Sequence, residues 1–211
     1  MEKPMHIHII GVGGIGTSAL AQYYKAKGNV VSGSDASRSE ITDFLKTQGI
    51  NIHIGDDPQN VRGANLVIHS AAVKEGNAEY DAAKLDRIPT KLYAEAMGEI
   101  TENYTLIAIS GSHGKSTTTS MVAKIMIEAG LDPTVIVGTK MHELNGNNFR
   151  MGQSEFFVLE ADDYNRHFHN YRPTVSVVTN VDREHLDIYG DLEGVKLSLI
   201  HIWRCRRYSL C

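Results

Sequence analysis

The sequence predicts an α/β protein in which two parallel-sheet units follow each other along the chain. An apolar run leads into the glycine-rich turn GVGGIG (11–16), and a second apolar run leads into the turn GSHGKST (111–117). Short apolar runs and amphipathic stretches also alternate along the chain. Alternation of this kind is typical of strand–helix–strand units that bury a parallel sheet.

The first hundred residues contain four apolar runs, each bounded by turn residues and followed by a stretch with helical periodicity. We expect strands at 6–10, 29–33, 51–54 and 65–69, and helices near 15–27, 38–48, 77–86 and 92–100. The polar segment GEITENYT (98–105) has no apolar period. We therefore predict a Rossmann-like, doubly wound parallel domain over residues 1–102.

A second alternation predicts the first part of a P-loop α/β ATPase domain over residues 103–200. We expect a strand at 105–110, a helix at 115–130, a strand at 133–138, a polar hairpin-like stretch around 140–153, and strands at 156–160 and 174–179. The domain is short for a nucleotide-hydrolysing unit, so we expect it to be incomplete. The basic segment 201–211 carries the single Trp and both Cys residues, and we expect it to be a non-native tail.

Composition excludes several classes of protein. Hydrophobic residues make up 42% and charged residues 22% of the chain, which is enough for a core and argues against bulk disorder. The formal net charge of −4 gives no electrostatic reason to expect nucleic acid or an anionic membrane as a partner. No apolar run has the length of a membrane span and no signal peptide is recognisable, so we expect a cytoplasmic protein. No protein partner can be inferred.

The second glycine turn has the residue types that hold a nucleoside triphosphate. Its N–H groups and the positive end of the following helix can face the phosphates, Lys115 can neutralise β/γ oxygens, and Ser116 can ligate Mg²⁺. The general pattern has a glycine six residues before the lysine, where this chain has Ile109. We predict a shorter variant of the phosphate loop, against the alternative of a Gly-rich strand-to-helix turn without a ligand.

The first glycine turn has the spacing of a dinucleotide-binding fingerprint. A strand, G-x-G-x-x-G, a helix and a second strand are followed by Asp35, which lies 19 residues beyond Gly16. The same turn suits any diphosphate laid across a helix N-terminus. Two phosphate-binding turns in one chain predict two nucleotide-like ligands.

Acidic and imidazole side chains follow the last two predicted strands. Glu160 is our candidate for a Mg²⁺ ligand, and Asp162 and Asp163 are less favoured, because the carboxyl ends of parallel strands face the phosphates. A solvated acidic loop is the alternative. Asn180 and His185 follow the strand 174–179, and neutral imidazole is a fair ligand for a second divalent ion, although a lone His after a strand is more often structural.

The chain contains three linked motifs, in the order GSHGKSTTT, LEADDYNR and TNVDREHLDIYG. Together they resemble the central domain of the Mur ligase family, the ATP-dependent enzymes that build the peptidoglycan stem peptide. The resemblance covers roughly residues 5–199. His113 and the N-terminal GVGGIG…GSD resemble the branch that joins L-alanine to UDP-N-acetylmuramate. Glu184 stands where the family usually has Asp.

The resemblance implies a role for each matching position. The ATP phosphates would be bound by Gly111, Ser112, His113, Gly114, Lys115, Ser116 and Thr117. The UDP-sugar would be bound by Gly11, Val12, Gly13, Gly14, Ile15, Gly16, Asp35, Ser70 and Ala71. Mg²⁺ would be held by Ser116, Glu160 and His185, and the catalytic residues would be Lys115, Glu160 and His185.

The implied reaction forms an amide bond through an acyl phosphate, with ATP and Mg²⁺ as cofactors and UDP-N-acetylmuramate and L-alanine as substrates. The chain alone is expected to be inactive, because the family places its adenine and amino-acid contacts in a further C-terminal domain. Two alternatives stay open: a non-catalytic module that binds UDP-sugar or another nucleotide, and an NAD-dependent oxidoreductase based on the first glycine turn and Asp35.

Overall fold

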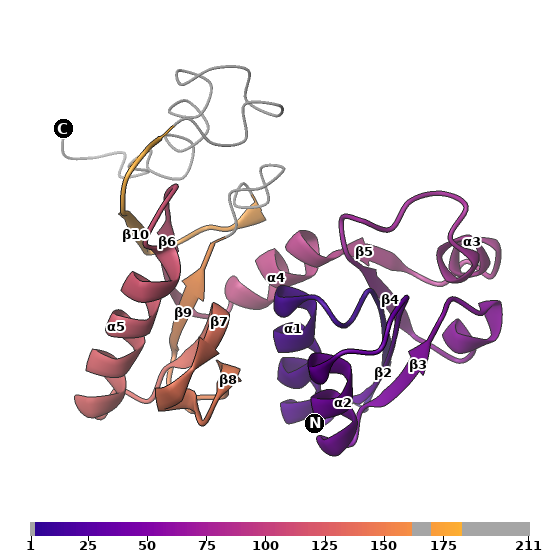
Figure 1. Ribbon diagram of the computed structural model, residues 1–211, viewed down its shortest axis with the longest axis horizontal. Coiled ribbons are helices and arrows are strands. Elements are labelled where there is room, and N and C mark those ends of the chain that lie inside the picture. The colour runs from indigo at the N-terminus through magenta and orange to yellow at the C-terminus, as the bar shows by residue number, and fades with distance from the viewer. Residues whose placement is uncertain (1–2, 162–169, 183–211) are drawn as a thin grey trace. The chain divides into compact units, whose positions relative to one another are not determined.

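The structure is a computed structural model of the chain and describes residues 3–161 and 170–182 (Figure 1). The predictions for Asp162, Asp163 and His185, and for the segment 201–211, lie outside these residues. Within the described part of the chain, no helix is both long and apolar enough to cross a lipid bilayer.

The first sheet contains five parallel strands in the order β3-β2-β1-β4-β5. They are β1 (His6–Ile10), β2 (Val30–Asp35), β3 (Asn51–Ile54), β4 (Leu66–His69) and β5 (Thr90–Leu92). The chain winds outward from β1 to β3 and then returns to the other side of β1. This reversal opens a crevice at the carboxyl ends of β1 and β4, which is where ligands bind in open α/β sheets.

Helices cover both faces of the first sheet. They are α1 (Ile15–Ala26), α2 (Glu40–Thr47), the 3₁₀ turn η1 (Pro58–Val61), α3 (Ala78–Leu85) and α4 (Tyr93–Thr101). In Figure 1, α1 and α2 lie on one side of the sheet and α3 lies on the other. The central strand is covered on both faces, since Ile7 and Ile9 on one face and His8 on the other have no exposed surface.

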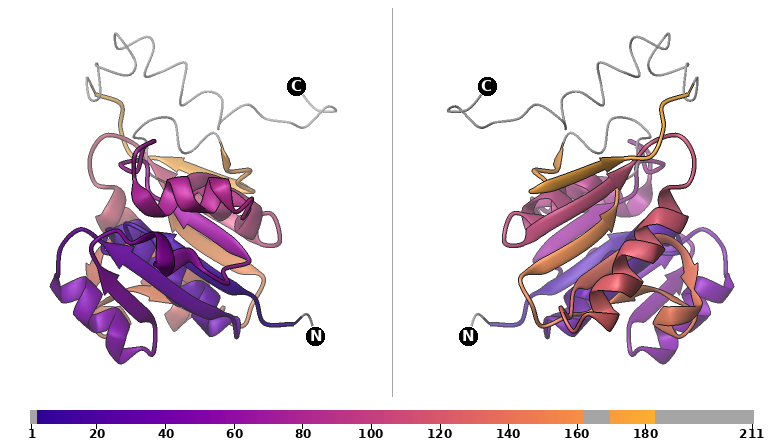
Figure 2. Two further views of the ribbon diagram at one scale, coloured as in Figure 1. Left: turned by 90° about the vertical axis from the view of Figure 1, so that its right-hand side faces the viewer. Right: turned by 90° about the vertical axis from the view of Figure 1, so that its left-hand side faces the viewer.

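The second sheet has the order β10-β6-β9-β7-β8, and β10, β6, β9 and β7 are parallel. Its elements are β6 (Thr105–Ser110), α5 (Lys115–Glu128), β7 (Thr134–Met141), η2 (His142–Leu144), β8 (Asn147–Arg150), β9 (Phe156–Glu160) and β10 (Val175–Val178). Helix α5 packs on β6 and β9 (Figure 2). Leu106, Ile109 and Phe157 are fully buried in this sheet.

The two helices that follow glycine turns differ from α2 and α3 in how their N-termini are capped. Ser39 caps α2 by accepting a hydrogen bond from the Thr42 N–H, and Asn77 caps α3 by accepting one from the Tyr80 N–H. The N-cap residues of α1 and α5 are Gly14 and Gly114, which have no side chain that could cap the helix. A cap side chain therefore satisfies none of the N–H groups in the first turns of α1 and α5.

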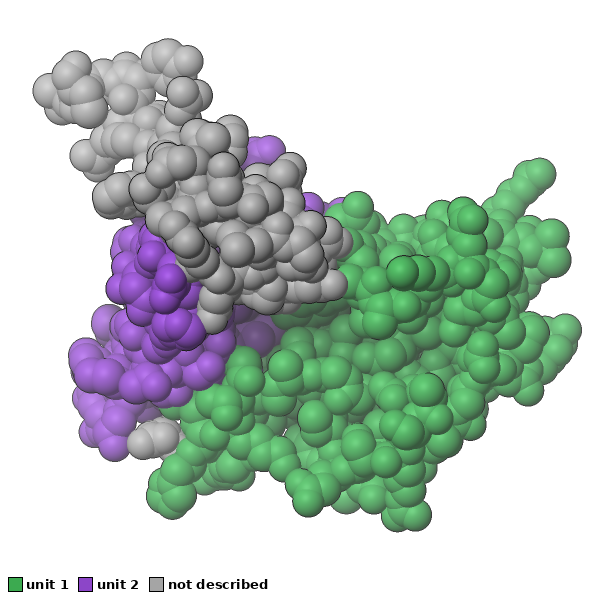
Figure 3. Space-filling view, turned by 45° about the horizontal axis from the view of Figure 1, so that its top comes forward, with its two compact units in different colours: residues 1–97, 138–151 green, residues 98–137, 152–211 purple. Residues whose placement is uncertain are grey.

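The chain divides into two compact units (Figure 3), one of residues 1–97 and 138–151 and the other of residues 98–137 and 152–211. In the first unit, β8 is tied to α1 because Asn147 Nδ2 donates to Gln22 Oε1 over 2.6 Å and Asn148 Nδ2 donates to the Ile15 carbonyl over 2.6 Å. The domain boundary near residue 102 stays a prediction.

The predicted fold class is confirmed, and each predicted strand is present with ends that agree within three residues. The strand β5 and the turn η1 were not predicted. β5 has three residues, which is too short to show an apolar period, and η1 depends on Asp57 accepting a hydrogen bond from the Gln59 N–H.

Candidate functional site

In the turn between β6 and α5, the ammonium group of Lys115 is hydrogen-bonded to backbone carbonyl groups of the turn. Gly111 and Gly114 have φ values of +122° and +79°, a region that only glycine enters without strain. Lys115 Nζ donates to the Gly111 carbonyl over 2.7 Å and to the Ser112 carbonyl over 3.3 Å. The positive charge of Lys115 therefore lies against the turn.

Three backbone donors at the start of α5 are left open. Among the residues that the structure describes, the N–H groups of Gly114, Ser116 and Thr117 have no acceptor. Successive N–H groups at a helix N-terminus carry partial positive charge and bind anions. Together with Lys115 they have the charge and the donors that suit a phosphate group, which is the ligand class predicted for this turn; the site itself stays a prediction.

Ser116 and Glu160 lie side by side at the carboxyl end of the second sheet. Ser116 Oγ donates to Glu160 Oε1 over 2.9 Å, which joins the first turn of α5 to the end of β9. The described ranges hold no group of three or more His, Cys, Asp and Glu side chains that could bind a metal ion. Two neighbouring oxygen ligands nevertheless suit Mg²⁺, which takes few protein ligands and completes its shell with water and phosphate oxygens.

The segment after β10 contacts the same turn. Thr179 Oγ1 donates to the His113 carbonyl over 2.6 Å, and the Asp182 N–H donates to Ser112 Oγ over 2.8 Å. Sequence analysis placed Asn180 near this edge but gave the segment no role in holding the turn. The pattern TVSVVTN predicts a strand and its end, and it does not indicate which neighbouring turn the strand end contacts.

The first glycine turn uses most of its own N–H groups internally. The Gly11 and Val12 N–H groups both donate to the Ser34 carbonyl, over 2.8 and 2.9 Å. The Gly13 N–H donates to Asp35 Oδ2 over 2.8 Å. In the described part of the chain, the open donors are those of Ile15, Gly16 and Thr17, in the first turn of α1.

Asp35 fixes the shape of this turn. Besides the Gly13 N–H on Oδ2, its Oδ1 accepts the Ser37 N–H over 3.2 Å. An acidic residue at this place in the fingerprint is associated with ribose hydroxyls. Here the carboxylate also holds the glycine turn on the end of β2.

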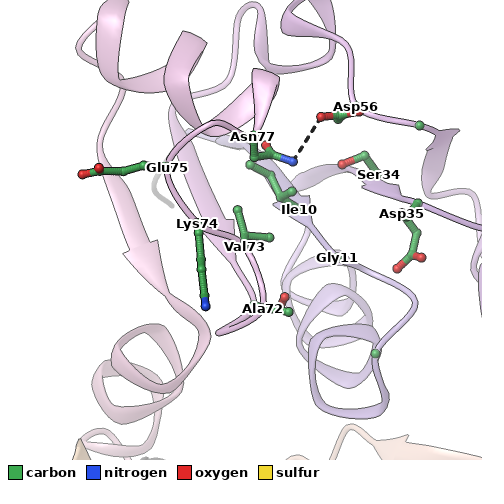
Figure 4. Close-up of a pocket in the computed structure, with 14 residues that line it drawn as sticks. Ile10, Gly11, Ser34, Asp35, Asp56, Ala72, Val73, Lys74, Glu75 and Asn77 are labelled. Atoms are coloured by element: carbon green, nitrogen blue, oxygen red, sulfur yellow. Dashed lines mark hydrogen bonds between the residues drawn. The ribbon is translucent and has the colours of Figure 1, made fainter.

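A pocket of about 620 Å³ opens beside this turn, at the carboxyl ends of β1 and β4 (Figure 4). Of the predicted UDP-sugar residues, Gly11, Gly14, Asp35 and Ser70 line it. Its walls do not include Val12, Gly13, Ile15, Gly16 or Ala71, whose roles stay predictions.

The loop after β4 supplies further pocket residues that sequence analysis left out. Ala72, Lys74 and Asn77 all line the pocket, and Lys74 is the single basic side chain among the described residues that do so. Asn77 Nδ2 lies 3.5 Å from Asp56 Oδ2 across the pocket wall (Figure 4). A basic residue in a polar loop is more often solvated, so sequence alone gave no reason to select Lys74.

A fully buried carboxylate, Glu79, lies beneath the pocket. Its Oε2 accepts a hydrogen bond from the hydroxyl of Ser34, which is a pocket residue, and lies 3.5 Å from His8 Nε2. Its Oε1 accepts a hydrogen bond from Asn60 Nδ2 over 2.6 Å. Burial alone would raise the pKa of Glu79, but hydrogen bonds from His8, Ser34 and Asn60 and the charge of His8 outweigh it and leave the pKa lowered.

Glu79→Gln is expected to lower the stability of the first unit at neutral pH by about 1–3 kcal/mol, because charge-assisted hydrogen bonds become neutral ones. When folding lowers the pKa of a carboxyl group, its full contribution to stability is present at pH values above its pKa in the unfolded chain, about 4.3. That contribution is lost as the pH falls through the pKa of the group in the folded protein. Thermal unfolding followed from pH 7 to pH 3 should therefore show a shallower acid loss for Glu79→Gln. Glu75→Gln, on an exposed loop residue, is the control, and identical pH profiles for Glu79→Gln and the unchanged chain would contradict this prediction.

Comparison with known families gives two matches that follow each other along the chain. The Mur ligase family, catalytic domain, matches residues 6–105, and the Mur ligase middle domain matches residues 109–204. Together they cover both glycine turns, Glu160 and the segment after β10.

Curated relatives agree with these matches. The chain is 42% identical over 199 residues to the UDP-N-acetylmuramate–L-alanine ligase of Agathobacter rectalis, with 93% of this chain and 43% of that protein covered. It is 46% identical over 195 residues to the enzyme of that name from Aquifex aeolicus, with 92% and 43% covered. The chain thus spans less than half the length of these relatives.

Solved structures show the same likeness. The UDP-N-acetylmuramate-alanine ligase MurC from Thermotoga maritima superposes with a TM-score of 0.89 at 32% identity, covering 95% of this chain and 47% of that one. The UDP-N-acetylmuramate:L-alanyl-gamma-D-glutamyl-meso-diaminopimelate ligase from Neisseria meningitides gives a TM-score of 0.87 at 28% identity, covering 95% and 68%.

Proposed function

The chain belongs to the Mur ligase family, and we propose that it is the nucleotide-binding part of an ATP-dependent ligase that joins L-alanine to UDP-N-acetylmuramate in peptidoglycan precursor synthesis. Relatives that are 42% and 46% identical are named for this reaction. The observation that carries the proposal is the presence of two separate glycine turns. Each leads into a helix without a side-chain cap and leaves three N–H groups with no acceptor among the described residues. One turn would bind the UDP diphosphate and the other the ATP phosphates.

The proposed reaction proceeds by attack of the substrate carboxylate on the γ-phosphorus of ATP, which gives an acyl phosphate and ADP. The L-alanine amine then attacks the acyl carbon, inorganic phosphate leaves, and the amide bond forms as the amine loses a proton. Neither step needs a side-chain nucleophile. The protein's task is to position the reactants and to offset the repulsion between carboxylate and triphosphate.

Lys115 and the open N–H groups of α5 would receive the triphosphate. Lys115 Nζ, which donates to two carbonyl groups of the turn, can transfer its hydrogen bonds to phosphate oxygens. Ser116 and Glu160 would hold Mg²⁺, with His185 proposed as a ligand for a second ion. When bound, Mg²⁺ supplies charge neutralisation at the phosphate oxygens.

Lys74 would be the cation that accompanies the UDP diphosphate, because the other charged side chains that line the pocket are carboxylates. Lys74→Ala is expected to weaken UDP binding about tenfold and to leave ATP binding unchanged. Isothermal titration with UDP at two salt concentrations measures both the loss and its electrostatic origin. Lys84→Ala, on the neighbouring helix α3 and outside the pocket lining, is the control. Unchanged UDP affinity for Lys74→Ala would contradict this role.

The cytoplasm is the proposed location of the reaction, because ATP is consumed there and the UDP-linked substrate is a soluble nucleotide sugar. Separate titrations of the 211-residue chain with UDP-N-acetylmuramate, Mg-ATP and NADH test the proposal as a whole. Independent binding of the first two ligands is expected. Binding of NADH in competition with UDP-N-acetylmuramate would favour the oxidoreductase alternative and overturn the proposal.

A further inference from the structure

The side chain of Asn180 makes a two-point contact with the backbone of one residue, His113, in the turn between β6 and α5. Its Oδ1 accepts the His113 N–H over 2.9 Å, and its Nδ2 donates to the His113 carbonyl over 3.0 Å. The backbone carbonyl of Asn180 also accepts the Ser112 N–H over 3.1 Å. Three hydrogen bonds from one residue therefore fix the orientation of Ser112 and His113.

The two residues that Asn180 contacts come immediately before the open N–H donors of the turn. The residue after His113 is Gly114, whose N–H is the first of the three that have no acceptor in the described part of the chain. The Gly111 end is confined as well, because a Cβ at Gly111 would lie 2.7 Å from the Asn180 carbonyl oxygen. Asn180 thus restricts the part of the turn that comes before the phosphate donors in sequence.

We infer that Asn180 is a positioning residue for the ATP phosphates. Its amide holds the turn in the conformation in which the N–H groups of Gly114, Ser116 and Thr117 are directed at one anion. The inference rests on the proposed triphosphate site and adds to it a residue from the segment after β10. Asn180 contacts the turn and would not itself need to contact ATP.

The solvent exposure of Asn180 distinguishes a positioning role from a purely structural one. Asn180 is exposed to solvent, so its hydrogen bonds compete with water and add little to the stability of the whole unit. Their effect is local, because they restrict a short turn with two glycines in left-handed conformations. Loss of the amide should therefore change ATP affinity far more than the unfolding temperature.

Isothermal titration of the 211-residue chain with Mg-ATP tests the inference. Asn180→Ala is expected to weaken ATP binding about tenfold, with an unfolding temperature and a UDP-N-acetylmuramate affinity close to those of the unchanged chain. Asn180→Asp keeps the acceptor for the His113 N–H but loses the donor and adds a negative charge, so at least the same loss is expected. Val181→Ala, on the neighbouring exposed residue, should bind ATP normally.

The outcomes distinguish the inference from the proposed function. Normal ATP affinity of Asn180→Ala, with binding by the unchanged chain, would overturn the inference alone. An equal fall of ATP affinity, UDP-N-acetylmuramate affinity and unfolding temperature would show a structural residue and would also overturn it. Failure of the unchanged chain to bind Mg-ATP would overturn the triphosphate site itself and the inference with it.

Discussion

Lys115→Ala is expected to weaken Mg-ATP binding at least about 100-fold, which corresponds to about 2.7 kcal/mol. The Lys115 ammonium is the charged group of the turn, and its two hydrogen bonds to the carbonyl groups of Gly111 and Ser112 place it where the β- and γ-phosphates would lie. Charge-assisted contacts to phosphate are among the strongest hydrogen bonds in proteins. Isothermal titration with Mg-ATP measures the loss directly.

Two comparisons make the Lys115 result specific. Lys124→Ala removes a lysine from the exposed side of the same helix and should leave ATP binding unchanged. Binding of UDP-N-acetylmuramate to Lys115→Ala should also be unchanged, because the pocket proposed for UDP is lined by residues of the first unit. An equal loss of both ligands would contradict the assignment of one ligand to each turn.

Gly111→Ala is expected to abolish measurable ATP binding and to destabilise the second unit by about 2 kcal/mol or more. A non-glycine residue at a φ of +122° is strained, which costs about 1–3 kcal/mol. The added Cβ would also lie 2.7 Å from the backbone oxygen of Asn180, a contact that forces the turn or the segment after β10 to move. Thermal unfolding and titration with Mg-ATP measure the two effects.

Gly130→Ala provides the matched comparison in the same unit. Gly130 also has a positive φ, +74°, but a Cβ there would have no neighbour within 4 Å. This variant should show only the backbone strain and should bind ATP with unchanged affinity. ATP binding by Gly111→Ala equal to that of Gly130→Ala would rule out the close approach of Thr179 and Asn180 as a constraint on the turn.

The sequence was sufficient for the longer helices and strands and for the position of the two turns, because both depend on local patterns. The strand β1 and the turn Gly11–Gly16 are adjacent along the chain, and so are β6 and the turn Gly111–Gly114. Alternating apolar runs indicate parallel strands, and a glycine turn before an uncapped helix indicates an anion site. Ser116 and Glu160 could be paired from sequence because carboxyl ends of parallel strands lie at one edge of a sheet.

The supporting residues could not be identified in this way. Glu79 lies in the first turn of α3, where a carboxylate is ordinarily explained by the helix dipole, and its contact with His8 spans 71 residues of sequence. Asn180 reaches His113 across 67 residues. Such contacts depend on how neighbouring strand ends are aligned, and local periodicity carries no information about side-chain contacts at that distance.

A crystal structure of the chain grown with UDP and a non-hydrolysable ATP analogue tests the central claim most directly. The claim predicts the analogue's β- and γ-phosphates within hydrogen-bonding distance of the N–H groups of Gly114, Ser116 and Thr117, with the UDP diphosphate at the first turn of α1. The analogue bound at Gly11–Gly16, or away from both turns, would contradict it.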